Sequence, residues 1–189
     1  SSGRFEEGCI GDWLEDALAV LDHSRERAAV LVGSSMGGWL MLLMALARPE
    51  VVKGLVGIAA APDFTEDLIA ARATAEQLAA LARDGIHRVP SAYGEPLPLS
   101  RRLIEDGRRH LVLRGPMVLG CPVHLLHGQQ DVDVPWQTAL RLAARLESGA
   151  VTVELVKDGD HRLSRDVDLR RLTAAADRVL SLATTGLPL

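Results

Sequence analysis

A five-residue motif near the start of the chain constrains the fold more than any other feature. Residues 33–37 read Gly-Ser-Ser-Met-Gly, which is G-x-S-x-G with Ser35 at its centre. The motif stands between a wholly apolar run at 28–32 and a largely apolar helical stretch at 39–48 that ends before Pro49. A strand that turns sharply into a helix at such a motif exposes the serine at the edge of a sheet. The sequence therefore predicts a strand-turn-helix unit that presents Ser35.

The glycines of this motif are expected to relieve crowding at the turn. Because the sharp turn forces the serine into an uncommon backbone conformation, side chains at 33 and 37 would collide there, and glycine at both positions removes the clash. Ser34 is the alternative nucleophile, but the positions two residues before and after it are Val32 and Met36 rather than glycine. Next to Ser35, the Met36 N–H and Gly37 begin the expected helix, whose positive end favours an oxyanion.

The rest of the chain alternates short β-branched runs with longer helical patterns, which is typical of a parallel βαβ sheet. Strands are expected within residues 28–32, 52–60, 122–127 and 151–156. Helices are expected at 12–23, 39–48, 63–83, 101–110, 135–146 and 164–182. Residues 86–100 contain three prolines and are expected to form a loop. We predict an α/β fold, with helices on both faces of a mostly parallel sheet and residues 62–120 as a small helical cap, because that segment is too long for one crossover.

A serine nucleophile needs a histidine that takes its proton and a carboxylate that holds the histidine. Asp131 follows the third expected strand in HGQQD, and His161 follows the fourth in KDGDH. Because parallel strands end at the same edge of the sheet, both side chains are expected beside Ser35. The chain order Ser, Asp, His is also the one that accompanies G-x-S-x-G. The sequence therefore predicts Ser35, Asp131 and His161 as a catalytic triad.

Several nearby residues compete for these roles. Asp133 is the alternative acid, although it leads into a helix start, where an aspartate more often caps. Asp158 and Asp160 are interpreted as turn formers or as residues that orient the histidine loop. His124 and His127 lie in or at the end of a strand, so we interpret them as packing or turn residues.

Composition excludes several classes of protein. The chain has 189 residues, of which 48% are apolar and 24% charged, and a net charge of −4. These values are those of a globular protein, and they exclude disorder and an electrostatic binder of nucleic acid. The longest apolar run, Trp39–Ala47, is far shorter than the roughly 18–20 residues of a membrane span. Cys9 and Cys121 give neither a disulfide framework nor metal-ligand spacing, which suits a reducing compartment.

Five stretches of the chain resemble the α/β-hydrolase superfamily, and within it the palmitoyl-protein thioesterase and acyl-glucuronide esterase branch, which has mammalian mitochondrial and bacterial members. They are GSSMGGWLML at 33–42, ARPE at 47–50, CPVHLLHG at 121–128, VPW at 134–136 and DHR at 160–162. The resemblance implies a serine esterase or thioesterase that forms an acyl-enzyme, with Ser35, Asp131 and His161 as triad and the Met36 amide as oxyanion donor. It implies a small acyl ester or thioester as substrate, no metal and no cofactor, and, for a bacterial source, a cytoplasmic location.

The chain departs from the complete members of that family at its start. They have strands before the nucleophile strand and an early loop that supplies a second oxyanion N–H, whereas this chain opens Ser-Ser-Gly without a methionine. We therefore expect residues 1–189 to form a single, incomplete α/β-hydrolase domain. The strand at 28–32 would then be an exposed apolar edge, prone to aggregation. The missing donor would lower catalysis by about 10²–10³-fold.

Other functions stay open at this point. A catalytically impaired binding or scaffold protein on the same fold is one alternative, and a hydrolase of peptide, lactone or C–C bonds is another. The apolar residues of the cap would line an acyl pocket or pack as an ordinary amphipathic face. Its arginines at 101, 102, 108 and 109 would meet an anionic part of a substrate or form a solvated face. The acyl chain length and the oligomeric state stay open as well.

Overall fold

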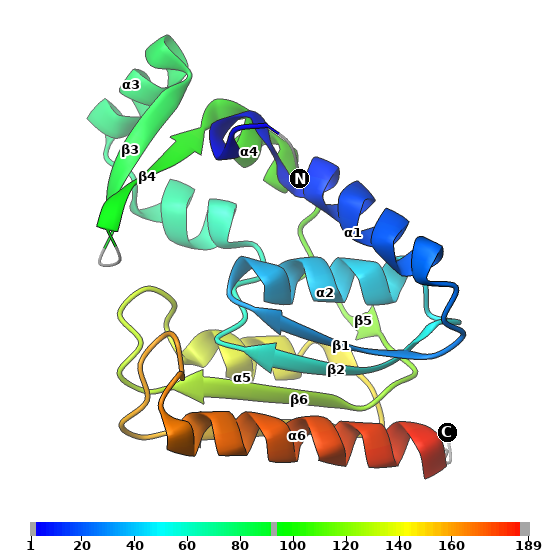
Figure 1. The fold of residues 1–189 in the computed structure, drawn as a ribbon. Helices are drawn as coiled ribbons and strands as arrows, with labels where there is room; N and C mark the ends of the chain where they lie inside the picture. The colour runs from blue at the N-terminus through cyan, green and yellow to red at the C-terminus, as the bar shows by residue number, and fades with distance from the viewer. Residues whose placement is uncertain (1–2, 92–93, 186–189) are drawn as a thin grey trace. The chain divides into compact units, whose positions relative to one another are not determined.

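The computed structural model describes residues 3–91 and 94–185, and it has the α/β fold that the sequence predicts. Its main sheet contains four parallel strands in the order β1-β2-β6-β8 (Figure 1). These strands are β1 Ala29–Ser34, β2 Val52–Ile58, β6 Val123–Gly128 and β8 Val151–Val156. All four lie where sequence patterning placed them. Two further short strands, β5 Met117–Val118 and β7 Leu146–Glu147, form a parallel pair that was not predicted.

Helices cover both faces of this sheet, as expected. Helix α2 (Met36–Ala47) contacts β1 and β2, α6 (Asp166–Thr185) contacts β2 and β6, and α5 (Gln137–Ala143) contacts β8 (Figure 1). A Cβ at Gly57 would lie 3.6 Å from the side chain of Met41 in α2, and one at Gly54 would lie 2.4 Å from Val179 in α6. Residues three apart on a strand point to opposite faces, so α2 and α6 lie on opposite sides of β2.

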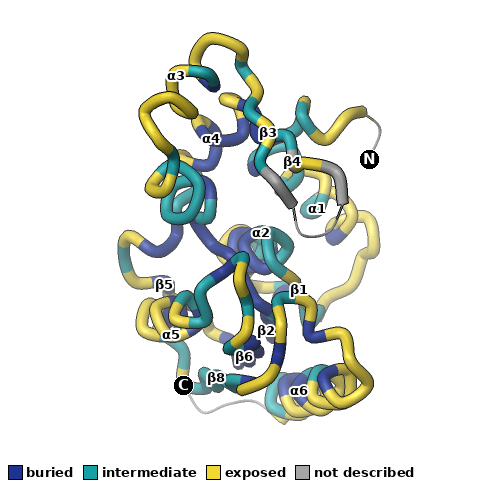
Figure 2. Tube along the Cα trace, turned by 90° about the vertical axis from the view of Figure 1, so that its left-hand side faces the viewer, coloured by how far each residue is buried: buried dark blue, intermediate teal, exposed yellow. Residues whose placement is uncertain are grey.

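The core of the sheet lies along its inner strands. Every residue of β6 is buried (Figure 2). On the α6 face, the buried cluster joins residues of β2, β6, β8 and the loop after β8 to α6: Val56, Leu126, Val156, Leu163, Ala175 and Val179. β1 is an edge strand of this sheet, and the side chain of Val32 is 55% exposed. The edge position agrees with the expectation, but of the apolar residues of β1 only Val32 is exposed, and Ala29, Val30 and Leu31 are half-buried.

The chain divides into two compact units. One unit consists of Val20–Pro62 and Val112–Leu189 and contains the main sheet. The other consists of Ser1–Ala19 and Asp63–Leu111, and α1 (Ile10–Ser24) begins in this unit and ends in the first. Its remaining elements are η1 Phe5–Glu7, η2 Thr65–Ile69, η3 Ala70–Arg72, α3 Ala75–Asp84, β3 Ile86–Ser91, β4 Gly94–Ser100 and α4 Arg101–Gly107. The boundaries 62–120 given above for a cap stay a prediction.

The single long helix expected at 63–83 is wrong. The segment contains a π-helical turn, a 3-10 turn and then α3, which begins only after Thr74. The Thr74 hydroxyl accepts the Gln77 N–H at 3.2 Å, and the Gln77 side chain accepts the Thr74 N–H at 2.9 Å. This capping box satisfies two amide groups that a continuous helix would have bonded to the preceding turn. Gly85, at φ +76°, ends α3.

The loop expected at 86–100 is also wrong, because β3 and β4 form an antiparallel hairpin there. Residues 92–93 of this segment lie outside the described residues. Pro98 pairs with Arg88, and Pro96 lies two residues earlier on the same strand. Since the N–H groups of alternate residues point to the same edge of a strand, both missing donors fall on one edge. Prolines spaced by two are therefore compatible with this two-stranded hairpin.

Within residues 3–91 and 94–185, no helix combines the length and the apolar character that crossing a membrane requires.

Candidate active site

Ser35 lies in a strained turn between β1 and α2. Its φ is +52° and its ψ −120°, a region that residues with a side chain rarely occupy. The turn is held by the end of β2, because the Ser35 N–H donates to the Ile58 carbonyl at 2.9 Å and the Ser35 carbonyl accepts the Ala61 N–H at 3.0 Å. The serine is thereby fixed at the carboxyl edge of the sheet, as the motif predicts.

The two motif glycines differ in what they do. A Cβ at Gly33 would lie 2.4 Å from the Gly37 carbonyl oxygen, so only glycine fits there. A Cβ at Gly37 would meet no atom of the described chain within 4 Å. The predicted clash is therefore correct for Gly33 and wrong for Gly37. Gly38 is instead the glycine that lets α2 pack closely against Ala60, because a Cβ at Gly38 would lie 2.5 Å from the Ala60 side chain.

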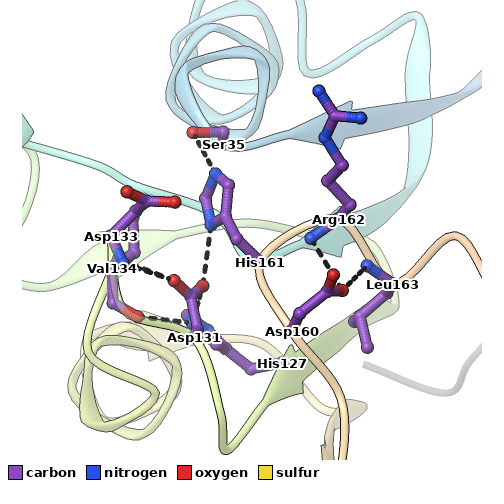
Figure 3. A network of polar contacts seen from close by, with 9 residues as sticks. All are labelled: Ser35, His127, Asp131, Asp133, Val134, Asp160, His161, Arg162 and Leu163. Carbon is purple, nitrogen blue, oxygen red and sulfur yellow. Dashed lines mark hydrogen bonds and ion pairs between the residues drawn. The ribbon is translucent and has the colours of Figure 1, made fainter. Parts of the chain in front are cut away.

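The three residues predicted as a triad lie in one hydrogen-bonded line (Figure 3). His161 Nε2 is 3.1 Å from Ser35 Oγ, and His161 Nδ1 is 2.7 Å from Asp131 Oδ2. The residues come from the loops after β1, β6 and β8, which meet because these parallel strands end at the same edge. Both distances lie within hydrogen-bond reach, so the imidazole is placed to exchange a proton with the serine.

Asp131 is buried with all its hydrogen bonds satisfied inside the protein. Its side chain has no exposed surface, and Oδ1 accepts the N–H groups of Asp133 at 2.9 Å and Val134 at 2.8 Å. Oδ2 accepts from His161 and, at 3.1 Å, from His127 Nε2. Burial raises the pKa of Asp131, but the hydrogen bonds from His127, His161 and Val134 outweigh it and hold that pKa well below its usual range. Asp133, the alternative acid, contributes a backbone N–H to this site.

His127 is the residue of this site that the sequence reading missed. Instead of a packing or turn role alone, the structure gives it hydrogen-bond contact with Asp131 and, at 3.0 Å, with the Val134 carbonyl. The available signal was its spacing, because His127 lies near the end of the strand that precedes the acid and stands four residues before Asp131. A histidine on a buried strand gives no other sign of such a contact.

The loop that carries His161 is shaped by its own carboxylates. Asp160 Oδ1 accepts the N–H groups of Arg162 at 3.1 Å and Leu163 at 2.9 Å (Figure 3). Asp158 pairs with Arg165 at 2.7 Å at the other end of the loop. Asp160 thus forms a turn directly after the histidine, and Asp158 ties the loop to Arg165; these correspond to the two roles considered for them. The hydrogen bond that His161 donates to Asp131 raises the pKa of His161, and burial opposes that rise only in part.

A glycine allows close contact between the loop after β6, which carries Asp131 (the acid loop), and the loop after β8, which carries His161 (the histidine loop). A Cβ at Gly128 would lie 2.2 Å from the carbonyl oxygen of Gly159, and the Gln130 N–H donates to the same oxygen at 2.8 Å. Any side chain at Gly128 would push this backbone away. The distance between Asp131 and His161 thus depends on a backbone-to-backbone contact between Gly128 and Gly159. The sequence alone did not indicate this contact.

One cluster at this edge has the composition of a metal site. Ligand-type atoms of Asp131, Asp133 and His161 lie within 4.8 Å of one another. Asp131 already accepts four N–H donors, and His161 Nδ1 already contacts its carboxylate. A cation would have to replace these hydrogen bonds, so we assign no metal to the cluster, and the expected independence from cofactors stays a prediction.

The cap arginines pair within their own unit. Arg108 contacts Glu66 and Arg109 contacts Asp106, both at 2.7 Å. Arg102 contacts Asp12 at 2.8 Å, and Arg101 lies 3.7 Å from Glu105. These ion pairs favour the solvated face over recognition of an anionic substrate.

Comparison with known proteins gives consistent results. A sequence profile described as "alpha/beta hydrolase fold" matches residues 2–91. The chain is 38% identical to the mouse protein "Palmitoyl-protein thioesterase ABHD10, mitochondrial", over all of this chain and 64% of that protein. Among solved structures, a putative hydrolase from Agrobacterium vitis S4 is 45% identical with a TM-score of 0.91, over 94% of this chain and 71% of that one. Mouse alpha/beta hydrolase domain-containing protein 10 is 37% identical with a TM-score of 0.85, over 95% and 72%.

The chain spans slightly less than two thirds of the length of the curated mammalian relatives that it matches, between 61% and 64%.

Proposed function

Because this chain belongs to the alpha/beta hydrolase fold family, we propose that it is a serine hydrolase that cleaves acyl thioesters or carboxylic esters through an acyl-enzyme. The observation that carries the proposal is the line of hydrogen bonds from Asp131 through His161 to Ser35. A serine held at a strained turn, with an imidazole 3.1 Å from its hydroxyl, is the arrangement that nucleophilic catalysis requires.

In the proposed reaction, Ser35 Oγ attacks the carbonyl carbon of the substrate while His161 Nε2 takes the hydroxyl proton. The ionised Asp131 stabilises the resulting imidazolium through Nδ1. The tetrahedral intermediate collapses as the C–S or C–O bond breaks, and His161 returns the proton to the leaving thiolate or alkoxide. Water, deprotonated by His161, then attacks the acyl-serine, releases the acid and restores Ser35.

The negative oxygen of the intermediate needs N–H donors. Met36 is the first residue of α2, and the first N–H groups of a helix have no acceptor within it. The Met36 amide follows the nucleophile directly, which is the donor position associated with G-x-S-x-G. We assign it as one oxyanion donor, and the neighbouring Gly37 leaves the approach to it open.

The proposed substrate class follows from the relatives. The mammalian proteins are named as palmitoyl-protein thioesterases, which favours a thioester of a long acyl chain over a simple carboxylic ester. The same names place those proteins in mitochondria, so the cytoplasmic location expected for a bacterial source is not confirmed. A C–C, peptide or lactone substrate has no comparable support among these relatives.

The test is turnover of acyl thioesters and p-nitrophenyl esters of graded chain length by the wild type, Ser35→Ala and Ser34→Ala. Ser34 is the matched control because it is the adjacent, exposed residue that ends β1. We expect thioester hydrolysis that Ser35→Ala abolishes and Ser34→Ala retains. A folded wild type without turnover on the whole series would favour the binding or scaffold alternative instead.

A further inference from the structure

We propose that His127 is a positioning residue for Asp131, which it locks toward His161, and this role rests on the proposed function. His127 is the penultimate residue of the buried strand β6, and its side chain has no exposed surface. It therefore cannot touch a substrate, and any effect on catalysis must pass through Asp131. His127 lies within the stretch CPVHLLHG at 121–128, but the sequence assigned it no role beyond packing or a turn.

The contacts of His127 fix which nitrogen carries its proton. Nε2 lies 3.1 Å from Asp131 Oδ2 and 3.0 Å from the Val134 carbonyl oxygen. Both partners are acceptors, so Nε2 must be the donor. Nδ1 is buried and has no hydrogen-bond partner in the described part of the chain, so it carries the lone pair. The His127 ring thus donates only through Nε2, and it donates to Asp131.

The His127 N–H connects the two ends of the turn at residues 131–134. Within this turn, Asp131 Oδ1 already accepts the Val134 N–H at 2.8 Å. His127 adds a link from Oδ2 to the carbonyl oxygen of the same Val134. With both oxygens tied to one residue, rotation of the carboxylate about its Cβ–Cγ bond would break hydrogen bonds at both ends. Oδ2 therefore stays directed at His161 Nδ1, 2.7 Å away.

The same strand supplies a matched control. His124 is also buried, its Nδ1 also lacks a hydrogen-bond partner among the described residues, and its Nε2 lies 3.3 Å from Glu154. It differs from His127 in contacting a carboxylate of β8 that takes no part in the proposed reaction. Its replacement therefore reports the cost of removing a buried histidine from β6 without disturbing Asp131.

The experiment measures kcat and KM for thioester hydrolysis in full-length protein carrying His127→Leu, His127→Asn, His127→Gln or His124→Leu. The glutamine amide nitrogen reaches about as far as Nε2, whereas the asparagine amide reaches only as far as Nδ1. We expect His127→Leu and His127→Asn to lower kcat about 10–100-fold with KM unchanged, as for loss of a hydrogen bond to a charged group. His127→Gln should recover most of kcat, and His124→Leu should leave kcat within twofold of the wild type.

Equal kcat values for the wild type, His127→Leu and His127→Asn would overturn the positioning role and leave the proposed function intact. A wild type that turns over no thioester at Ser35 would instead remove the proposed function, and the positioning role with it. If the variants do not fold, ¹⁵N NMR of the wild-type histidines decides the matter. We expect the Nε2–H tautomer at His127, and an Nδ1–H tautomer there would contradict the proposal.

Discussion

At the scale of single residues, the contact between Asp131 and His161 predicts how the activity depends on pH. The hydrogen bond that His161 donates to Asp131 raises the pKa of His161 above its ordinary value of 6.5. Only neutral His161 can take the Ser35 proton, so the activity should be full above this raised pKa and fall as pH drops through it. The acid limb of kcat/KM should therefore have its midpoint above pH 6.5.

Asp131→Asn tests the cause of that shift. An amide cannot hold the imidazolium, so we expect kcat to fall about 10³–10⁴-fold, as loss of the acid does in serine proteases. Because the hydrogen bond that raises the pKa of His161 is lost, the residual activity should have its acid limb at lower pH. An acid limb that did not move in Asp131→Asn would show that another group is the base.

The triad residues could be predicted because each carries a local signal. Ser35 is marked by its flanking glycines, and Asp131 and His161 stand directly after apolar strands in the expected order. His127 carries no such signal, since its role depends on where its ring lies relative to Asp131. The same holds for Gly37, whose surroundings become visible only in the folded chain.

At the scale of elements, the contact between the acid loop and the histidine loop predicts that substitution of Gly128 lowers activity. Gly128→Ala would place a methyl group 2.2 Å from the Gly159 carbonyl oxygen and displace the histidine loop. We expect kcat to fall about 100-fold, because an error of about 1 Å in catalytic geometry has that effect. Gly120→Ala is the control, as its Cβ would meet no described atom within 4 Å. Equal kcat in both variants would show that the loop contact has no catalytic consequence.

At the start of helix α1, a backbone N–H donates to a carboxylate from a distant part of the chain. This contact predicts that the stability of the fold depends on pH. The buried Asp106 of α4 accepts the Gly11 N–H at 2.7 Å and pairs with Arg109. Burial raises the pKa of Asp106, but the bonds from Gly11 and Arg109 outweigh it and leave that pKa lowered. A carboxyl group with a lowered folded pKa stabilises the fold above its unfolded pKa, and this stabilisation is lost as pH falls through the folded pKa.

Urea unfolding as a function of pH measures this effect. At neutral pH, Asp106→Asn should lower the free energy of unfolding by about 1–3 kcal/mol, and the difference from the wild type should shrink below about pH 4. Asp177→Asn, on the exposed side of α6, is the control and should change little. A difference that stayed constant down to pH 3 would exclude the ionised Asp106 as its source.

Elements were predictable where one periodicity dominates, as in the four strands of the main sheet. Between Asp63 and Ser100 the prediction failed for two physical reasons. The alanine-rich pattern up to Arg83 suits a helix throughout, but the side chains of Thr74 and Gln77 create a helix start inside it. Proline marks a loop in most contexts, and its spacing in β4 becomes informative only once the hairpin partner is known.

At the scale of the whole molecule, the exposed strand edge predicts self-association of these 189 residues. β1 lies at the edge of the main sheet with Val32 55% exposed, and an apolar edge is a template for pairing with another chain. Val32→Lys should reduce association at high concentration, as measured by light scattering. Val20→Lys is the control, because Val20 is 71% exposed but lies on a helix. If both variants associate to the same extent, the edge of β1 is not the contact.

The central claim is that Ser35 is an activated nucleophile, and covalent labelling with a fluorophosphonate tests it most directly. The probe reacts with a serine whose proton a neighbouring base removes, whatever the natural substrate. In the full-length protein we predict one adduct, located on Ser35 by peptide mass spectrometry, absent from Ser35→Ala and slowed at pH values where His161 is protonated. A folded wild type that takes up no label, or a label that persists in Ser35→Ala, would contradict the account.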